Sequence, residues 1–343
     1  MDFSDATHPP RWRRGPTQAG ALKSRPEDFQ VEEIPVYEPS GSGEHLFVKI
    51  RKVDLSTPEA VKRLCRALDA PVKSAGWAGM KDRHAVTTQW VSLHEVTAEA
   101  AATAEVEGVT VLEAIPHEKK LKTGHLRGNR FELRIREVSD PDALVAAFGE
   151  IEVVPGYFGE QRFGRDNLDR AKAWLVDGGR APRDRVQKRF LVSALQSAVF
   201  NSVVAQRVRD RTLTTVIDGD VLQTQRGGLF DAAEDDDPQS RLDDGEVIPT
   251  ALLPGKDVRW ATGEALAMEQ AGCDAWSVDE ATMGRMGRLG RGTRRATFVR
   301  PVELEASRDG DDVRVTFSLP SGRYATVVVR EALDEAADRP KTP

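Results

Sequence analysis

Segments near both ends of this chain alternate apolar with polar residues, and a long helical pattern lies between them. Residues 45–53, 131–138 and 313–319 alternate with a period of two, which is typical of a strand with one buried face. The valine-rich stretch 324–329 follows a Pro-Ser-Gly turn and predicts a hairpin with 313–319. Strand-rich ends around a helical middle indicate an α+β domain that a second domain interrupts, from near residue 155 to near residue 298.

Two helices are predicted from their apolar spacing. Residues 56–71 offer Ser56 or Thr57 as N-cap and Pro58 in the first turn, with Cys65 on the apolar stripe. Residues 187–209 form one long helix in the same way. We expect its buried side to carry Phe190, Leu191, Ala194, Leu195, Ala198 and Val199.

Composition excludes several classes of protein. No apolar run approaches the roughly 18 residues of a membrane helix, and the first residues show no apolar core of a signal peptide. The two cysteines, Cys65 and Cys273, are far apart, which excludes a disulfide framework and favours the reducing cytoplasm. The histidines and cysteines lack metal-site spacing, so we expect no metal.

Charge is distributed unevenly along the chain. The net charge is −6, yet residues 117–136 and 284–300 are strongly basic, as is the cluster at 180–189. The segment 231–246 is strongly acidic. If the basic segments meet in space, they form a footprint for phosphates; the alternative is that each one is an ordinary solvated face.

The densest chemical signal is the segment 75–90. Small residues precede the cluster Lys81-Asp82-Arg83-His84, and an alternating strand pattern follows. Glycines let the backbone approach a ligand, and neighbouring cations keep an aspartate ionised, as a nucleophilic or electrostatic carboxylate requires. The alternative is an ordinary turn in which Asp82 pairs with a neighbouring arginine.

Several segments, in order, resemble motifs of the TruD-type tRNA pseudouridine synthases. Residues 79–89 (GMKDRHAVTTQ) are similar to the motif that holds the family's essential aspartate. The other similar segments are 25–33 (RPEDFQVEE), 127–131 (RGNRF), 156–164 (GYFGEQRFG), 190–201 (FLVSALQSAVFN) and 319–330 (LPSGRYATVVVR). The resemblance spans roughly residues 20–332.

The resemblance implies a fold and a reaction. The fold is α+β, with a catalytic domain on a mixed, mainly antiparallel sheet (1–154 plus 299–343) and an inserted α+β TRUD domain (155–298). The reaction is isomerisation of uridine to pseudouridine in tRNA, at position 13 of the D-arm. It breaks N1–C1′, joins C5 to C1′ and needs no cofactor. The implied partner is tRNA, with no membrane and no obligate protein partner.

The resemblance also implies site residues. Asp82 is the catalytic carboxylate, by attack on C6 or C1′ or by a glycal-like route. Lys23 pairs with Asp82 or a phosphate, Phe29 and Phe131 pack near the extruded base, and Asn129 holds the site by hydrogen bonds. The expected phosphate contacts are Lys119, Lys122, Arg127, Arg291, Arg294 and Arg295.

Two other functions stay open at this stage. One is a non-catalytic RNA-binding or RNA-folding protein on the same scaffold, which would have no need of an acid facing phosphates. The other is a glycosidase-like hydrolase, which ordinarily uses two carboxylates around the scissile bond. The sequence shows no second carboxylate near Asp82 in that role.

Overall fold

The computed structural model describes residues 4–164 and 166–334, which divide into two compact units. Unit 1 comprises residues 4–14, 153–164, 166–300 and 326–331, and unit 2 comprises the remaining described residues. The expected catalytic range differs from unit 2 in the segments 4–14 and 326–331, and in residues 153–154 and 299–300 at the domain boundaries, all of which lie in unit 1. Which unit is catalytic stays a prediction at this level.

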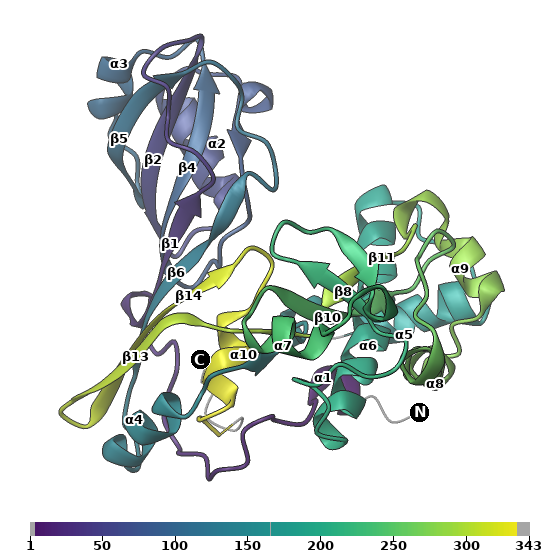
Figure 1. Ribbon diagram of the computed structural model, residues 1–343. Helices are drawn as coiled ribbons and strands as arrows, with labels where there is room; N and C mark the ends of the chain where they lie inside the picture. The colour runs from purple at the N-terminus through teal and green to yellow at the C-terminus, as the bar shows by residue number, and fades with distance from the viewer. Residues whose placement is uncertain (1–3, 165, 335–343) are drawn as a thin grey trace. The chain divides into compact units, whose positions relative to one another are not determined.

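Unit 2 is built on an eight-stranded sheet in the order β13-β14-β6-β1-β4-β2-β5, with β3 also paired to β4. Only the β1–β4 pair is parallel among these described pairings, so the sheet is mixed and mainly antiparallel, as expected. Figure 1 shows the yellow strands β13 and β14 continuing the sheet from β6. The strands are β1 (Phe29–Pro35), β2 (His45–Val53), β3 (Gly76–Trp77), β4 (Val86–His94), β5 (Val109–His117), β6 (Leu126–Ile135), β13 (Val302–Asp309) and β14 (Asp312–Pro320).

Alternation explains why these segments are strands. In β6 the side chains of Phe131, Leu133 and Ile135 are buried, whereas those between them face outward. Strand β2 has the predicted bounds, whereas β6 both begins and ends earlier than predicted, at Leu126 and Ile135. The strand predictions over 45–53 and 313–319 are therefore confirmed, and the third is confirmed with both ends shifted.

Three helices accompany this sheet: α2 (Thr57–Ala67), α3 (Ala98–Ala102) and α4 (Pro141–Gly149). The Ser56 hydroxyl caps α2 by accepting a hydrogen bond from the Glu59 amide. Val61, Leu64 and Cys65 are buried in the cluster that α2 shares with β2 and β4. The predicted helix and its Ser56 cap are confirmed, except that α2 ends at Ala67 rather than just before Pro71, and Cys65 is a core residue.

The predicted hairpin of 313–319 with 324–329 is wrong. Strand β14 pairs with β13 on one side and β6 on the other, so both of its edges are already occupied. The valine-rich stretch instead forms helix α10 (Ala325–Arg330), whose three valines are buried. Burial of the valines outweighs their preference for strands, which depends strongly on context.

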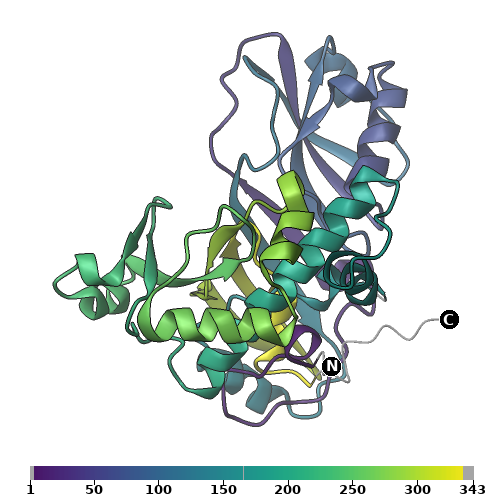
Figure 2. The same ribbon diagram turned by 90° about the vertical axis from the view of Figure 1, so that its right-hand side faces the viewer.

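Unit 1 is arranged around the long helix α6 (Arg185–Arg209), visible in teal in Figures 1 and 2. Helices α1, α5 and α8 pack against it, as does strand β10. It ends where predicted and begins two residues earlier, but Phe190 is not on the buried side: that side chain is 55% exposed. Residues 185–190 are exposed or half-buried, and burial along α6 begins at Leu191.

The other elements of unit 1 are short. Strands β11, β10, β8 and β9 form one sheet in that order, and β7 pairs with β12. The strands are β7 (Val154–Pro155), β8 (Val221–Thr224), β9 (Leu229–Asp231), β10 (Val247–Leu253), β11 (Thr293–Ala296) and β12 (Phe298–Val299). The helices are α1 (Ser4–Thr7), α5 (Asn167–Ala171), α7 (Pro238–Asp243), α8 (Gly263–Ala275) and α9 (Glu280–Met286).

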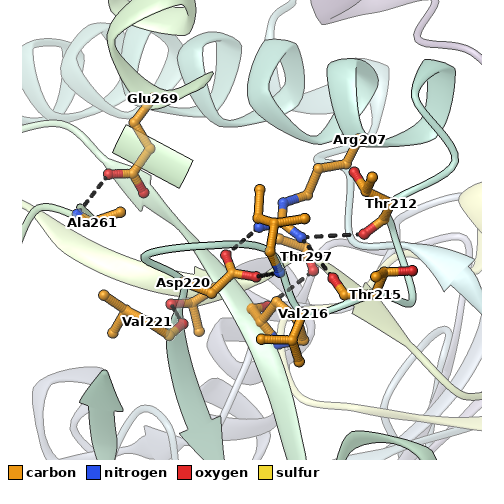
Figure 3. A network of polar contacts seen from close by, with 12 residues as sticks. Arg207, Thr212, Thr215, Val216, Asp220, Val221, Ala261, Glu269 and Thr297 are labelled. Atoms are coloured by element: carbon orange, nitrogen blue, oxygen red, sulfur yellow. Dashed lines mark hydrogen bonds and ion pairs between the residues drawn. The ribbon is translucent and has the colours of Figure 1, made fainter. Parts of the chain in front are cut away.

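Buried polar groups tie unit 1 together. The guanidinium of Arg207 on α6 pairs with Asp220 and donates to the carbonyls of Thr212 and Thr215 (Figure 3). The side chains of Arg207 and Asp220 are both almost completely buried. Such a pair is costly to break, since one partner alone would leave an uncompensated buried charge.

The described part of the chain shows no membrane or metal feature. None of its helices combines the length and the apolar character that crossing a membrane requires. No three His, Cys, Asp or Glu side chains of the described residues gather in a way that could hold a metal ion.

Candidate active site

The loop that carries Asp82 precedes β4 and is anchored on both sides. The Lys81 amide donates to the Thr57 hydroxyl at 3.0 Å, at the start of α2. The Lys81 ammonium forms a buried ion pair with Glu33 on β1, with 2.7 Å between Nζ and Oε2. The loop therefore lies against both α2 and β1. Lys81 holds the loop in place rather than facing solvent.

Lys52 fixes the position of Asp82 itself. Its Nζ donates to the Asp82 carbonyl oxygen at 2.7 Å, and the side chain is fully buried. Burial lowers the pKa of Lys52 to about 8, although the charge of Asp82 opposes that shift. Lys52 was not identified from the sequence. The pattern that could have identified it is the alternation of β2, because Lys52 shares the inward-facing side of the strand with Val48 and Ile50.

The side chain of Asp82 lies beside Lys23. Lys23 Nζ is 3.7 Å from Asp82 Oδ2 and 4.0 Å from the centroid of the Phe29 ring. The backbone of Lys23 has a φ of +59°, an uncommon conformation for a residue with a side chain. About a third of the Asp82 side chain is exposed (35%), so the carboxylate is paired yet accessible.

The segment that leads into β1 is held by a second ion pair. Asp28 is buried and accepts hydrogen bonds from Arg136 Nε at 2.8 Å and Nη2 at 2.6 Å. It also accepts one from the Arg25 amide at 3.0 Å. Asp28 raises the pKa of the Arg136 guanidinium, chiefly through these hydrogen bonds. This pair sets the start of β1, where Phe29 contacts Lys23.

Three phenylalanines form a stacked group on neighbouring strands. The Phe131 ring on β6 stacks on Phe317 of β14, with centroids 5.3 Å apart, and meets the edge of Phe29 at 6.2 Å. All three rings are buried. The alternation in 313–319 marks Phe317 as inward-facing, but the sequence analysis gave it no role. The group links the Lys23–Asp82 pair to β6.

Asn129 lies on β6, opposite Glu33 on one side and Leu319 on the other. Because Glu33 holds Lys81, the Asp82 loop reaches β1 at the level of Asn129. The Asn129 Oδ1 atom is buried and has no hydrogen-bond partner among the described residues. A buried acceptor of this kind is satisfied in a folded protein by a bound water, an ion or a ligand, or it has a functional role.

Comparison with known proteins matches this chain to one family over nearly all of its length. The family model described as tRNA pseudouridine synthase D (TruD) matches residues 13–174 and 183–332. A tRNA pseudouridine synthase D of Anaeromyxobacter sp. (strain Fw109-5) is 39% identical over 336 residues, covering 95% of this chain and 96% of the relative. That of Aliivibrio fischeri (strain MJ11) is 38% identical over 334 residues, covering 94% of each.

The chain belongs to the TruD family.

As a TruD-family member it is a tRNA pseudouridine synthase, an enzyme of the isomerase class. The fold agrees. A solved structure of a protein described as a tRNA pseudouridine synthase D, from Methanosarcina mazei, superposes with a TM-score of 0.75. The two sequences are 22% identical, and the superposition covers 96% of this chain and 97% of the Methanosarcina mazei chain. The expected family and fold class are confirmed.

The expected phosphate contacts in unit 2 are exposed. Lys119 and Lys122 lie in the segment between β5 and β6, and Arg127 lies on β6. The segment approaches the Asp82 loop, because the Gly124 amide donates to the Ala78 carbonyl at 2.8 Å. In this TruD-family member these three cations are therefore placed near the candidate site.

The three expected arginines of unit 1 have different surroundings. Arg291 is exposed and pairs with Asp257 at 2.7 Å. Arg295 lies over the Phe158 ring at 4.2 Å and donates to the Gly156 carbonyl. Arg294 is buried, with its guanidinium bound to Glu269 and Thr250. We correct the expectation for Arg294, because a buried and saturated guanidinium has no surface to offer a phosphate.

Proposed function

We propose that this enzyme converts uridine to pseudouridine at position 13 of the tRNA D-arm, with Asp82 as its catalytic residue. The observation that carries the proposal is an accessible carboxylate on an anchored loop, paired with Lys23. Position 13 rests on the resemblance to the TruD family. In the same proposal unit 2 is the catalytic domain, residues 155–298 are the inserted domain, and the enzyme acts on tRNA in the cytoplasm.

The reaction requires a correctly positioned uridine and one carboxylate. The N1–C1′ bond breaks, the uracil turns, and C5 bonds to C1′ while its hydrogen leaves as a proton. The reaction is redox-neutral, and the proposal includes no cofactor. Extruding the uridine costs a few kcal/mol, which contacts with the flipped nucleotide offset. The Lys23 ammonium, 3.7 Å from Asp82 Oδ2, is the cation that faces this carboxylate.

Asn129 is proposed to recognise the extruded uracil. Its Oδ1 is a buried acceptor with no described partner, and uracil carries an N3–H donor. A hydrogen bond between them would satisfy both groups and would discriminate against cytosine, which lacks that donor. Phe131 lies two residues from Asn129 on β6, and Phe29, opposite Leu133, meets the Phe131 ring edge-on, so the two rings supply apolar surroundings.

The test is tritium release from tRNA transcripts labelled at C5 of uridine, because a synthase must expel that hydrogen. We expect release by the wild type, no release by Asp82→Asn, and similar tRNA affinity for both proteins. Chemical mapping of the product should show pseudouridine at position 13. Matched loss of binding and turnover in a folded Asp82→Asn would contradict the catalytic assignment.

The two other functions give different products. An RNA-binding protein would bind tRNA tightly without releasing tritium. A hydrolase would release free uracil, whereas a synthase retains the base on the ribose. Chromatography of the reaction mixture separates these outcomes in one experiment.

A further inference from the structure

The first turns of α6 expose apolar side chains beside cations. Val186 and Phe190 are 58% and 55% exposed and lie four residues apart on the helix, so they are neighbours on one face. Arg185 and Arg189 are also exposed and have the same spacing. We call these four residues the α6 surface. At about 100° per residue they cover a continuous arc of about 140° around the helix.

No structural role accounts for the α6 surface. No described residue forms an ion pair or side-chain hydrogen bond with its two arginines, and Val186 and Phe190 are more than half exposed. Asp184, the one acid within 183–190, is engaged at the helix N-cap through the Val186 amide. Exposed phenylalanine beside unpaired arginines is typical of a surface that binds another molecule.

A second basic run reaches the same helix. The turn Gly287–Leu289 packs against α6, and a side chain at Gly290 would lie 2.5 Å from Val192. Arg288 in this turn is exposed. Two of the three basic runs in the sequence, 180–189 and 284–300, therefore meet on α6 in unit 1.

We propose that the α6 surface binds an unpaired part of the tRNA substrate, with Phe190 stacked on a base and Arg185 and Arg189 on the adjoining phosphates. Arginine favours phosphates, and an aromatic ring stacks on any base. A second copy of this chain fits less well, because a symmetric contact would oppose the same cations. The inference rests on the proposed function. It adds an RNA contact outside the candidate site, all of whose residues lie in unit 2.

The experiment compares Phe190→Ala and the double variant Arg185→Ser/Arg189→Ser with two control variants of unit 1. Leu229→Ala removes another exposed apolar side chain, and Arg226→Ser removes another exposed arginine. Affinity for full-length tRNA is measured by filter binding at several salt concentrations, and kcat and KM by tritium release. Circular dichroism melting checks that every variant is folded.

We expect Phe190→Ala to raise the Kd and KM for tRNA about tenfold, as loss of one stacked base does, without changing kcat. Phe190→Tyr should restore both values. The double arginine variant should flatten the plot of log Kd against log salt by about 1.5, for two lost phosphate contacts. Both controls should behave as the wild type.

Each other result has a distinct meaning. If Phe190→Ala binds tRNA as the wild type does, the inference is overturned while tritium release by the wild type upholds the proposed function. If Phe190→Ala instead changes only the sedimentation coefficient, the surface joins two copies and the inference is also overturned. If the wild type releases no tritium, the proposed function fails, and the tRNA affinities still decide whether the surface binds RNA.

Discussion

At the scale of single residues, the candidate site depends on buried cations as much as on the carboxylate of Asp82, the proposed catalytic residue. Lys52 holds the Asp82 carbonyl, and Lys81 joins the same loop to Glu33. The sequence pointed to Asp82 by its charged neighbours, with an ordinary turn as the alternative, and to Lys23 and Asn129 only through resemblance to a family. It gave no role to Lys52, although the parity of the strand marks that lysine as inward-facing. A buried lysine needs a specific acceptor, and a linear sequence does not show which carbonyl lies opposite.

Replacing Lys52 should reveal its titration. The folded-state pKa is about 8, below the value of about 10.4 in an unfolded chain. As pH rises from 8 toward 10.4, the folded protein has lost a proton that the unfolded chain still binds, so stability rises with pH. Relative to Lys52→Met, the wild type should gain about 2 kcal/mol in the free energy of unfolding between pH 7 and pH 10.

Urea unfolding of the two proteins at each pH measures this difference. Lys49→Met is the matched control, because Lys49 lies on the same strand but is partly exposed. The control should show a difference from the wild type that changes little with pH. A constant difference for Lys52→Met as well would contradict the lowered pKa.

At the scale of elements, local patterns predicted strands β2, β6 and β14 and helices α2 and α6, and they failed where tertiary contacts determine the structure. The bounds of β2 and the end of α6 followed from the apolar period alone. The stretch 324–329 became a helix, because β14 already had two partners. Phe190 became exposed, because an apolar residue at the right helical angle is buried only where another element covers it.

Thr57 connects the start of α2 to the Asp82 loop of the candidate site, and replacing Thr57 should loosen that loop. Its hydroxyl accepts from the Lys81 amide and donates to Gln89 Oε1 at 2.9 Å, in a fully buried position. Thr57→Val keeps the shape but leaves both partners unsatisfied, which should cost about 2–4 kcal/mol of stability. We also expect kcat to fall about tenfold or more, because the carboxylate loses its fixed position.

Urea unfolding and tritium release measure the two effects of Thr57→Val. Thr103→Val is the control, since its hydroxyl bonds only to carbonyls at the exposed end of α3. Unchanged kcat in a destabilised Thr57→Val would show that the loop is held by Lys52 and Glu33 alone.

At the scale of the whole molecule, the chain forms two compact units, and successive segments of the sequence alternate between them. The strand-rich ends and helical middle predicted a discontinuous domain around an insertion. The sequence did not predict two short segments of unit 1. Residues 4–14 and 326–331 belong to unit 1, although the residues that adjoin them in the sequence belong to unit 2. Such segments are too short to carry a periodic pattern, and their placement depends on contacts such as the Trp12 and Arg13 amides bonding to Glu331.

Because the two units have separate cores, breaking a buried ion pair in one unit should destabilise that unit much more than the other. Asp220→Ala leaves Arg207 buried without its partner, which should destabilise unit 1 by about 3–5 kcal/mol. Hydrogen exchange should then lose protection in α6 and β8 of unit 1, and much less in the eight-stranded sheet. The exposed Asp244→Ala serves as control. Equal loss of protection in both units would show that they unfold together.

The sheet of unit 2 has a consequence for how this protein is made. Strand β14, with Phe317, lies beside β6, with Phe131 and Asn129, although most of the chain separates them. A ribosome therefore exposes β6 with one edge unpaired until residues 302–320 emerge from the exit tunnel. Any nascent chain released before then lacks the ring that backs Phe131. Only a chain translated through residue 320 can therefore assemble the candidate site.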